Sequence, residues 1–440
     1  MNARCFLFFC LLYFAFAQIT AAQNRKLENG AILEQAAYVF PVYAQLPDWA
    51  KRLYTPESYP QISDSPDVEL VKIKYASDNL KITGFIYKPR KTDKKLPVVL
   101  WNRSGAGDVS ATGNHNFHNV YEMYQLAKAG FVVLASQYRG TDGSEGADEL
   151  GGGDTRDVMN LFPLAKRLPY ADAENLFAFG ASRGAMMTLQ AIRDGLPIKA
   201  AVVVGTPTDW NEMIRLHPDV VPEAKRLWQD FDRRRDEHIR NRSALVWADK
   251  LDVPLLILNG SDDPATPPSM AIALAQKLAE TGGIYELTIY ARDDHLISNN
   301  REDRLRRTIE WFQNPPKKSI GQVLLKTFKT NGIDAAIKQY RDLKAASADS
   351  YDWRETELNQ LGYVLLREGK AKEAVEIFRL NVEAYPNSFN VYDSFGEGLM
   401  SVGDLGGAIK NYKRSLALNP QNINAEQAIK KLEAETKKTN

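Results

Sequence analysis

The chain has 440 residues, of which 44% are hydrophobic and 25% are charged, so it is long enough for one large and one small globular domain. Its 56 basic and 55 acidic residues give a formal net charge of +1. A balance this even gives no global attraction to nucleic acid, and we predict no nucleic-acid partner.

Residues 1–22 have the pattern of a signal peptide. A short basic stretch at residues 1–4 precedes an apolar run that ends at Ala17. Small residues put the cleavage after either Ala17 or Ala22. The apolar run has about 13 residues, fewer than the roughly 18 to 20 that a membrane-spanning helix needs. We therefore predict an exported protein, periplasmic or secreted, with no membrane span after the signal is removed.

Both cysteines, Cys5 and Cys10, lie in this signal segment. The mature chain then has no disulfide and no cysteine nucleophile. Its stability must come from a hydrophobic core, which a chain of this size can bury.

Residues 23–66 mix aromatic residues and prolines without a period. We predict an N-terminal extension that lies across the following domain. Residues 68–75 and 80–87 alternate between apolar and polar side chains, which predicts two antiparallel edge strands.

Residues 67–314 predict an α/β domain, because short apolar runs alternate with helical stretches. The predicted strands are residues 97–102, 131–135, 176–179, 200–204, 255–258 and 285–290, and the predicted helices are residues 120–128, 186–193 and 270–280. Such alternation specifies a mostly parallel sheet with helices on both faces. Ligands of these sheets bind at the carboxyl ends of the strands.

A G-x-S-x-G motif, Gly180-Ala-Ser182-Arg-Gly184, stands between one of these strands and the next helix. This is the pattern of a nucleophile elbow, in which the serine Oγ projects above the sheet. The N–H of Arg183 lies at the helix start and is predicted to stabilise negative charge on a substrate oxygen. We predict that the Arg183 side chain faces solvent rather than a substrate carboxylate.

An acid and a base follow later strands in the order that a serine hydrolase requires. Asp263 ends the loop after residues 255–258, and His295 follows residues 285–290. We predict that Ser182 attacks a carbonyl, His295 transfers the proton and Asp263 orients His295.

The other histidines are predicted to have no catalytic role. His217 and His238 lie in a charged, helix-like stretch and are predicted to face solvent. His115 and His118 form an H-x-x-H in a polar loop without a nearby Glu or Cys partner. We therefore predict no metal site and no cofactor.

These motifs resemble those of the prolyl oligopeptidase family. Residues 259–263 resemble its His-Gly-x-x-Asp acid loop, with Asn259 in place of the histidine, and the match selects Asp263 over Asp262. Asp294-His295 resembles its histidine loop. Residues 138–146, 152–157 and 168–172 resemble the stretch that leads to its nucleophile. The resemblance covers roughly residues 67–313 and implies an α/β-hydrolase fold and a serine peptidase.

The chain departs from the family pattern in two places. The oxyanion strand usually ends in His-Gly-Gly, but here it ends in Asn102-Arg103-Ser104-Gly105, so the N–H of either Ser104 or Gly105 is the predicted second donor. Residues 23–66 are too few for the β-propeller that family peptidases often carry, so no propeller limits the size of the substrate.

Two functional questions stay open in this domain. An insertion at residues 206–251 either caps the pocket or forms a solvated helix pair. The substrate is a peptide, as the resemblance implies, or alternatively an ester, because the same triad cleaves both.

Residues 315–440 begin with a Pro-Pro linker and continue as a repeat. The residue pairs that lie 34 positions apart are Gly362 and Gly396, Gly369 and Gly403, Ala374 and Ala408, Phe378 and Tyr412, and Pro386 and Pro420. The pattern resembles tetratricopeptide repeats, with a looser copy at residues 322–343 and a closing helix at residues 423–432.

We predict that residues 320–440 either bind a protein partner or mediate self-association. The third alternative is that the whole chain is a catalytically silent protein that binds through these repeats.

Overall fold

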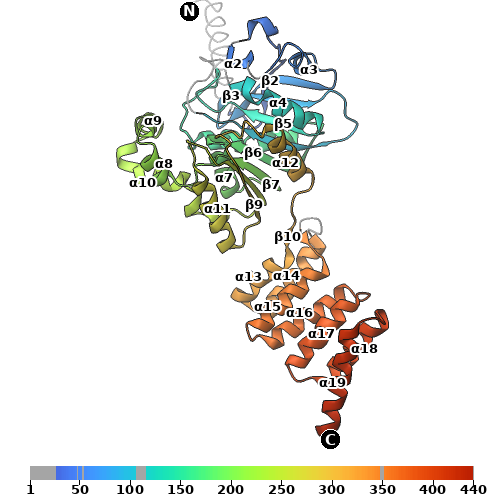
Figure 1. The fold of residues 1–440 in the computed structure, drawn as a ribbon. Coiled ribbons are helices and arrows are strands. Elements are labelled where there is room, and N and C mark those ends of the chain that lie inside the picture. Colours follow the sequence, from blue (N-terminus) through green and yellow to red (C-terminus); the bar gives the residue numbers. More distant parts are fainter. Residues whose placement is uncertain (1–25, 47, 52–53, 106–114, 347–350, 440) are drawn as a thin grey trace, which may run out of the picture. The chain divides into compact units, whose positions relative to one another are not determined.

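The computed structural model describes residues 26–439 except residues 47, 52–53, 106–114 and 347–350. The predicted signal peptide, residues 1–22, lies outside the described residues. The chain divides into two compact units, Met1–Pro316 and Lys317–Asn440 (Figure 1). No helix in the described part of the chain is both long enough and apolar enough to cross a membrane.

The first unit is built on a sheet in the order β1-β2-β3-β5-β4-β6-β7-β8-β9. The strands are β1 (Ile32–Ala37), β2 (Val68–Ser77), β3 (Leu80–Pro89), β4 (Leu96–Asn102), β5 (Val132–Ser136), β6 (Ala171–Ala181), β7 (Ala200–Val204), β8 (Leu255–Gly260) and β9 (Tyr285–Tyr290). The pairs β1–β2, β2–β3 and β3–β5 are antiparallel, and all other neighbours are parallel. The predicted mostly parallel sheet is confirmed.

The predicted edge position of β2 is wrong. Strand β1, from the extension that the sequence left without a regular element, pairs with β2 and forms the edge. The sequence of β1, ILEQAA, has no apolar–polar alternation, and most of its side chains are exposed. Main-chain hydrogen bonds to β2 hold this strand, so its side chains carry no pattern.

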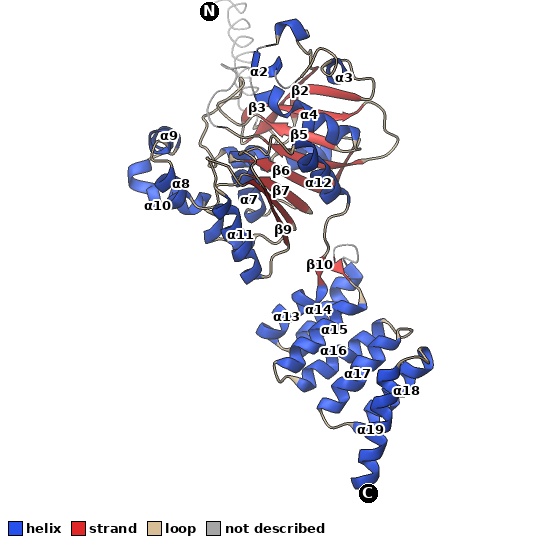
Figure 2. Ribbon diagram, in the orientation of Figure 1, coloured by secondary structure: helices blue, strands red, loops and turns tan. Residues whose placement is uncertain are grey.

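Helices cover both faces of the sheet (Figure 2). Helices α4 (His115–Lys128) and α12 (Arg301–Gln313) pack on one face together with the extension, and α5 (Asp154–Met159), α6 (Leu161–Arg167), α7 (Arg183–Arg193) and α11 (Pro268–Thr281) pack on the other. Strand β4 alternates accordingly: Val98 and Leu100 enter one core, and Val99 and Trp101 enter the other. A strand buried on both faces explains the continuous apolar runs in the sequence.

Helix α4 begins five residues before the predicted start. The H-x-x-H motif is therefore on a helix rather than in a loop. The side chains of residues 115–119 lie outside the described part of the structure.

The insertion, for which the sequence left open a cap or a solvated helix pair, contains three α-helices: α8 (Trp210–Leu216), α9 (Val220–Leu227) and α10 (Phe231–Arg242). Trp210, Trp228 and Phe231 are buried, and they belong to the same core as α7 and α11. The insertion is thus packed onto the unit rather than solvated on all sides.

Two side chains at the end of α10 hold the insertion in place. Arg242 is buried, stacks over Trp228 at 4.3 Å, and donates from Nε to the Leu150 carbonyl (2.6 Å) and from Nη2 to the Glu149 carbonyl (2.8 Å). His238 stacks on Trp228, with ring centroids 5.5 Å apart, and its Nε2 lies 2.8 Å from the Gln229 carbonyl.

His217 and His238 face solvent only in part, although the sequence predicted solvent-facing side chains. Both residues are only partly exposed, and His217 Nε2 is buried with no hydrogen-bond partner among the described residues.

The second unit consists mainly of paired helices. They are α13 (Ile320–Asn331), α14 (Ile333–Ala346), α15 (Glu355–Arg367), α16 (Ala371–Ala384), α17 (Phe389–Ser401), α18 (Leu405–Leu418) and α19 (Ile423–Thr439). Two short parallel strands, β10 (Lys318–Ser319) and β11 (Tyr351–Asp352), join the start of α13 to the segment before α15.

The 34-residue period has a direct packing reason. A Cβ on Gly362 would lie 2.5 Å from Cζ of Phe378, and a Cβ on Gly396 would lie 2.9 Å from Cζ of Tyr412. Each glycine makes room for the aromatic ring of the next helix, and the same contact recurs one period later.

Candidate active site

The G-x-S-x-G motif forms a sharp turn between β6 and α7. Ser182 has φ 54° and ψ −119°, a backbone conformation that is rare for any residue other than glycine. A Cβ on Gly180 would lie 2.5 Å from Oγ1 of Thr188, so the turn can close only with glycine there. The N–H of Ser182 donates to the Val204 carbonyl at the end of β7 (2.8 Å). The motif therefore has the local geometry of a nucleophile elbow.

Asp263 and His295 are in direct contact. Nδ1 of His295 lies 2.8 Å from Oδ2 of Asp263, whose side chain is fully buried, while 23% of the His295 side chain is exposed. Because a carboxylate can only accept, Nδ1 carries the proton and Nε2 is left as the acceptor. The neighbouring Asp262 is exposed and accepts a hydrogen bond from Ser261.

Ser182 and His295 both adjoin the end of β7. The Ser182 N–H binds Val204, and the next residue, Gly205, packs against the imidazole. A Cβ on Gly205 would lie 2.8 Å from Nδ1 and 2.9 Å from Cε1 of His295. The three predicted residues therefore gather at the carboxyl ends of β6, β7 and β8, with His295 just beyond β9.

The acid loop orients Asp263 through several donors. Oδ1 accepts from the N–H groups of Ala265 (2.8 Å) and Thr266 (2.9 Å), and Oδ2 accepts from Oγ1 of Thr266 (2.7 Å). Asn259, which replaces the histidine of the family pattern, lies 3.4 Å from Oδ2 through Nδ2. Burial alone raises the pKa of Asp263, but the bonds from His295 and Thr266 hold it below its ordinary value. Asp263 is therefore a carboxylate at neutral pH.

Sequence reasoning missed Thr266. It is the strongest side-chain partner of Asp263 after His295, and the signal was present: a threonine three residues after an aspartate is the spacing of an Asx or capping turn.

The histidine loop is held by two further residues that the sequence analysis did not single out. Asp293 is buried, and its carboxylate accepts from the N–H groups of Asn299 and Asn300 at 3.0 Å each. Arg304 donates to the carbonyl of Leu296, next to His295, at 2.6 Å. No local pattern marks Arg304, because its role depends on how α12 packs.

The predicted oxyanion donors lie beside the elbow. Gly184 packs against the end of β4, where a Cβ would lie 2.7 Å from the Arg103 carbonyl. The N–H of Arg183 is at the first position of α7, where no intrahelical acceptor exists. Among the described hydrogen bonds, none uses the N–H of Ser104 or Gly105.

The predicted solvent-facing position of the Arg183 side chain is wrong. Arg183 is 4% exposed and pairs with Asp148 at 2.5 Å and with Asp154. Burial alone lowers the pKa of Arg183, but Asp154 and Asp148 raise it above its ordinary value. The guanidinium is thus a permanent charge inside the unit, and it is committed to partners other than a substrate carboxylate.

Residues 138–146 and 152–157, which resemble the family's stretch before the nucleophile, are joined by an ion pair. Arg139 forms a bidentate pair with Asp157 (3.0 and 2.8 Å), and Ser77 donates to the same carboxylate (2.6 Å). Together with Asp154, these residues tie the loops beside α7 together.

Within the described residues, no group of three or more His, Cys, Asp or Glu side chains is arranged to hold a metal ion. The side chains of His115 and His118 are not among those described. The prediction that the protein needs no metal or cofactor therefore stays a prediction.

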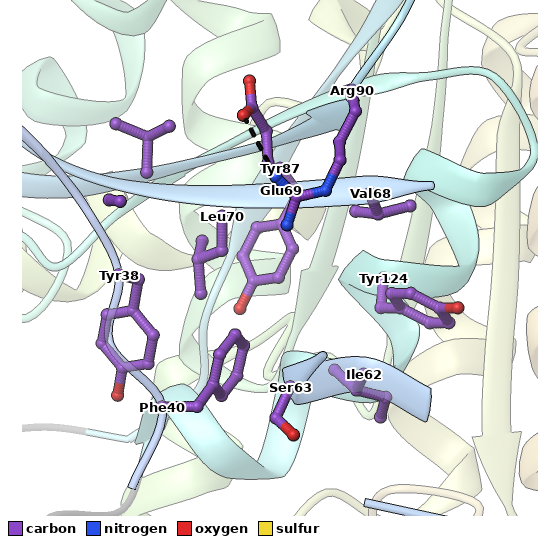
Figure 3. Close-up of a pocket in the computed structure, with 12 residues that line it drawn as sticks. Tyr38, Phe40, Ile62, Ser63, Val68, Glu69, Leu70, Tyr87, Arg90 and Tyr124 are labelled. Carbon is purple, nitrogen blue, oxygen red and sulfur yellow. Dashed lines mark ion pairs between the residues drawn. The ribbon is translucent and has the colours of Figure 1, made fainter. Parts of the chain in front are cut away.

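A separate cavity of about 90 Å³ lies where the extension crosses β2 and β3 (Figure 3). Tyr38, Phe40, Tyr87 and Tyr124 are among the side chains that line it, and an ion pair of 3.8 Å between Glu69 and Arg90 lies at its boundary. None of the predicted site residues lines this cavity.

Comparisons with known proteins find peptidases that resemble part of this chain. Residues 116–319 match the prolyl oligopeptidase family. An uncharacterized peptidase, YtmA, of Bacillus subtilis is 26% identical over 254 residues, covering 57% of this chain and 96% of the relative. A probable dipeptidyl-aminopeptidase B of Talaromyces stipitatus is 27% identical over 236 residues, covering 50% of this chain and only 25% of the relative.

The solved acylaminoacyl peptidase of Pyrococcus horikoshii has a similar fold, with a TM-score of 0.50 and 20% identity over 57% of this chain and 42% of that chain. This likeness supports an α/β-hydrolase fold for the matched part, and the chain spans less than half the length of that solved peptidase and about a quarter of the dipeptidyl-aminopeptidase. Residues 116–319 of this chain therefore match the prolyl oligopeptidase family, and relatives that this chain resembles are named as peptidases.

Proposed function

We propose that this chain is an exported serine peptidase in which Ser182, His295 and Asp263 form the catalytic triad. The single observation that carries the proposal is the hydrogen bond between His295 and a buried, ionised Asp263, next to a serine held at φ 54°. A strained, partly exposed serine beside an oriented imidazole is the arrangement that nucleophilic acyl transfer requires.

The chemistry follows from these positions. Oγ of Ser182 attacks the scissile carbonyl while Nε2 of His295 accepts its proton and then returns it to the leaving amine. Asp263 keeps Nδ1 protonated and stabilises the imidazolium. The N–H of Arg183 and the N–H of Ser104 or Gly105 bind the oxyanion, and water then releases the acyl-enzyme by the same steps.

Export is the part of the proposal that depends on the sequence alone. Residues 1–22 support it by their basic start, their short apolar run and the small residues before each cleavage position. Mass spectrometry of the protein recovered outside the cytoplasm should find an N-terminus at residue 18 or 23. An intact N-terminus on that protein contradicts signal cleavage.

We further propose that the second unit is a tetratricopeptide-like repeat domain. The recurring contact of a glycine with an aromatic ring, at Gly362 with Phe378 and at Gly396 with Tyr412, supports this assignment. Its role, in binding a partner or in self-association, is tested by measuring whether the chain is a monomer in solution.

A fluorophosphonate probe tests the catalytic proposal. It should label the wild type stoichiometrically at Ser182, label Ser182→Ala not at all, and label His295→Ala far more slowly. A folded wild-type protein that takes up no probe favours a catalytically silent binding protein. Matched peptide and ester panels then identify the leaving group, and hydrolysis of esters alone contradicts the peptidase assignment.

A further inference from the structure

Three consecutive carbonyl oxygens directly after β4, those of Arg103, Ser104 and Gly105, accept hydrogen bonds from buried side chains. The Arg103 carbonyl accepts from Oη of Tyr138 (3.1 Å), and the Ser104 carbonyl accepts from Nη1 of Arg103 (3.1 Å). The Gly105 carbonyl accepts from Nη1 of Arg183 (3.0 Å) and from Nη1 of Arg103 (3.3 Å).

The direction of these carbonyls sets the direction of the N–H groups. In a planar trans peptide, the C=O and the N–H point in opposite directions. Because the Arg103 and Ser104 carbonyls point at these internal donors, the N–H groups of Ser104 and Gly105 point away from them. These are the two N–H groups that the proposed mechanism offers as the second oxyanion donor.

The donors to these carbonyls form one rigid cluster. The guanidinium carbons of Arg103 and Arg183 lie 4.6 and 4.7 Å from the centre of the Tyr138 ring. Tyr138 is fully buried at φ 68°, a conformation that tertiary packing must hold. Asp148 fixes the Arg183 guanidinium through both terminal nitrogens, at 2.9 and 2.5 Å.

Arg103 has a different environment. Nη2 of Arg103 donates to the Gln137 carbonyl (2.7 Å) and to Oγ1 of Thr141 (3.0 Å). Burial, and then the charge of Arg183, lower the pKa of Arg103 to about 10, so it is still a cation at neutral pH. Carbonyl oxygens and an aromatic ring surround this charge.

We propose that Arg183 is a positioning residue for the oxyanion hole: its main chain supplies one donor, and its side chain, by binding the Gly105 carbonyl, anchors Gly105, one of the two candidate second donors. The bonds from Tyr138 and Arg103 to the two preceding carbonyls set the directions of the Ser104 and Gly105 N–H groups. Tyr138 and Arg103 complete this clamp. The inference depends on the proposed function, since an oxyanion hole has meaning only if Ser182 attacks a carbonyl.

The test uses Arg183→Lys in the full-length chain. Lysine keeps a positive charge opposite Asp148 and Asp154, but a single ammonium cannot also replace the planar fork that reaches the Gly105 carbonyl. A misplaced donor costs roughly 10- to 100-fold in rate. We therefore expect kcat to fall by about that factor while KM changes by less than about threefold.

A transition-state analogue gives a second readout. In a peptidyl trifluoromethyl ketone, Oγ of Ser182 adds to the carbonyl carbon, its proton passes to His295, and the carbonyl oxygen becomes an oxyanion. The Ki of this inhibitor should rise in Arg183→Lys in proportion to the loss of kcat/KM. A residue that only stabilises the fold would not produce this proportionality.

Arg193→Lys is the matched control on the same helix. Arg193 donates to the carbonyl of Asn241 (2.8 Å) and stacks over Trp247 (4.7 Å), so its replacement leaves the clamp intact. Its kcat and Ki should equal those of the wild type.

Tyr138→Phe keeps the inference falsifiable if Arg183→Lys does not fold. It removes the bond to the Arg103 carbonyl but keeps the ring between the cations, so kcat should fall several-fold at unchanged KM. Unchanged kcat in Arg183→Lys or, if that variant is unfolded, in Tyr138→Phe overturns the clamp. Failure of the proposed function looks different: the wild type itself takes up no fluorophosphonate.

Discussion

Ser182 occupies a backbone conformation that side-chain-bearing residues rarely adopt, and it does so at a crowded turn of the first unit. Such a conformation costs about 1–3 kcal/mol. The hydrogen bond to Val204 and the close packing of Gly180 and Gly184 hold the turn in place. The backbone strain is therefore located at the residue that carries the proposed nucleophile.

Comparing Ser182→Ala with Ser182→Gly separates chemistry from strain. Both variants lose the nucleophile, so turnover should fall by about 10⁵ to 10⁶. Glycine relieves the positive φ but alanine does not, so the glycine variant should be more stable than the alanine variant by about 1 kcal/mol. Urea unfolding measures the second difference. An alanine variant that keeps a tenth of the turnover contradicts the nucleophile assignment.

Asp263→Asn tests the orientation of the imidazole. An amide can present the wrong tautomer to His295, and kcat should fall by about 10⁴. Asp262→Asn, on the exposed neighbour, is the matched control and should keep wild-type turnover.

Comparing the wild type with Asp263→Asn also tests how the stability depends on pH. Because the pKa of Asp263 is lowered in the folded state, its stabilising contribution is complete above its unfolded pKa and is lost as the pH falls through the folded pKa. The difference in unfolding free energy between the wild type and Asp263→Asn should therefore be constant near neutral pH and should shrink below about pH 4. A difference that grows on acidification contradicts this sign.

At the residue scale, the sequence predicted the candidates that follow strands, because parallel strands bring their carboxyl ends to one edge. It missed Thr266, Asp293 and the buried pairing of Arg183, and each depends on partners that only folding brings close. Charge alone suggested solvent for Arg183, but Asp148 and Asp154, which lie far from it in the chain, make burial possible.

Helices α4 and α12 are joined by a buried ion cluster. Glu122 on α4 accepts two bonds from Arg301 (2.8 and 2.9 Å) and one from Arg304 (2.6 Å), and Arg304 also holds the Leu296 carbonyl beside His295. Burial alone raises the pKa of Glu122, but the two arginines lower it overall. The cluster connects the packing of two helices to the position of the histidine loop.

Glu122→Gln should destabilise the first unit by about 3–5 kcal/mol, because it leaves two arginines without their buried counter-charge. The contribution of Glu122 is complete above its unfolded pKa and is lost as the pH falls through its lower folded pKa. Thermal unfolding across pH measures both effects. Glu302→Gln is the control, since Glu302 is exposed and accepts one hydrogen bond from Oη of Tyr121 (3.3 Å), and its effect should stay below about 0.5 kcal/mol.

The sequence predicted helices and strands correctly where burial imposes a pattern of apolar residues, and it missed them where burial imposes none. Strands β4 to β8 are buried on both faces and appear as apolar runs, whereas β1 is held by main-chain bonds at the edge and carries no such pattern. The insertion appeared as charged helices, because its buried tryptophans are spaced too widely to mark a face.

The two units have separate hydrophobic cores, one pair around the sheet and another pair among the paired helices. The sequence located the repeat because each period preserves the same glycine and aromatic positions. Separate cores allow one unit to lose stability while the other keeps its structure.

Gly396→Val should destabilise the second unit by about 1–3 kcal/mol, because its side chain meets the Tyr412 ring. Fluorophosphonate labelling at Ser182 should be unchanged. Gly406→Ala on α18 is the control: its Cβ meets only Oδ1 of Asp404, at 4.0 Å, and better helix propensity should stabilise by about 0.5–1 kcal/mol. Loss of labelling in Gly396→Val would show that the units depend on each other.

Arg242 makes the insertion difficult to transplant. Its guanidinium completes the hydrogen bonding of two main-chain oxygens in a loop about ninety residues earlier in the chain, at Glu149 and Leu150, directly after the aspartate that pairs with Arg183. Replacing residues 206–251 with a shorter segment would remove Arg242 and leave those two oxygens without their hydrogen-bond donor. The loop that contains Asp148, next to the Ser182 turn, would then be held less firmly. A variant that changes this region must therefore replace the loop at Glu149 and Leu150 together with helix α10.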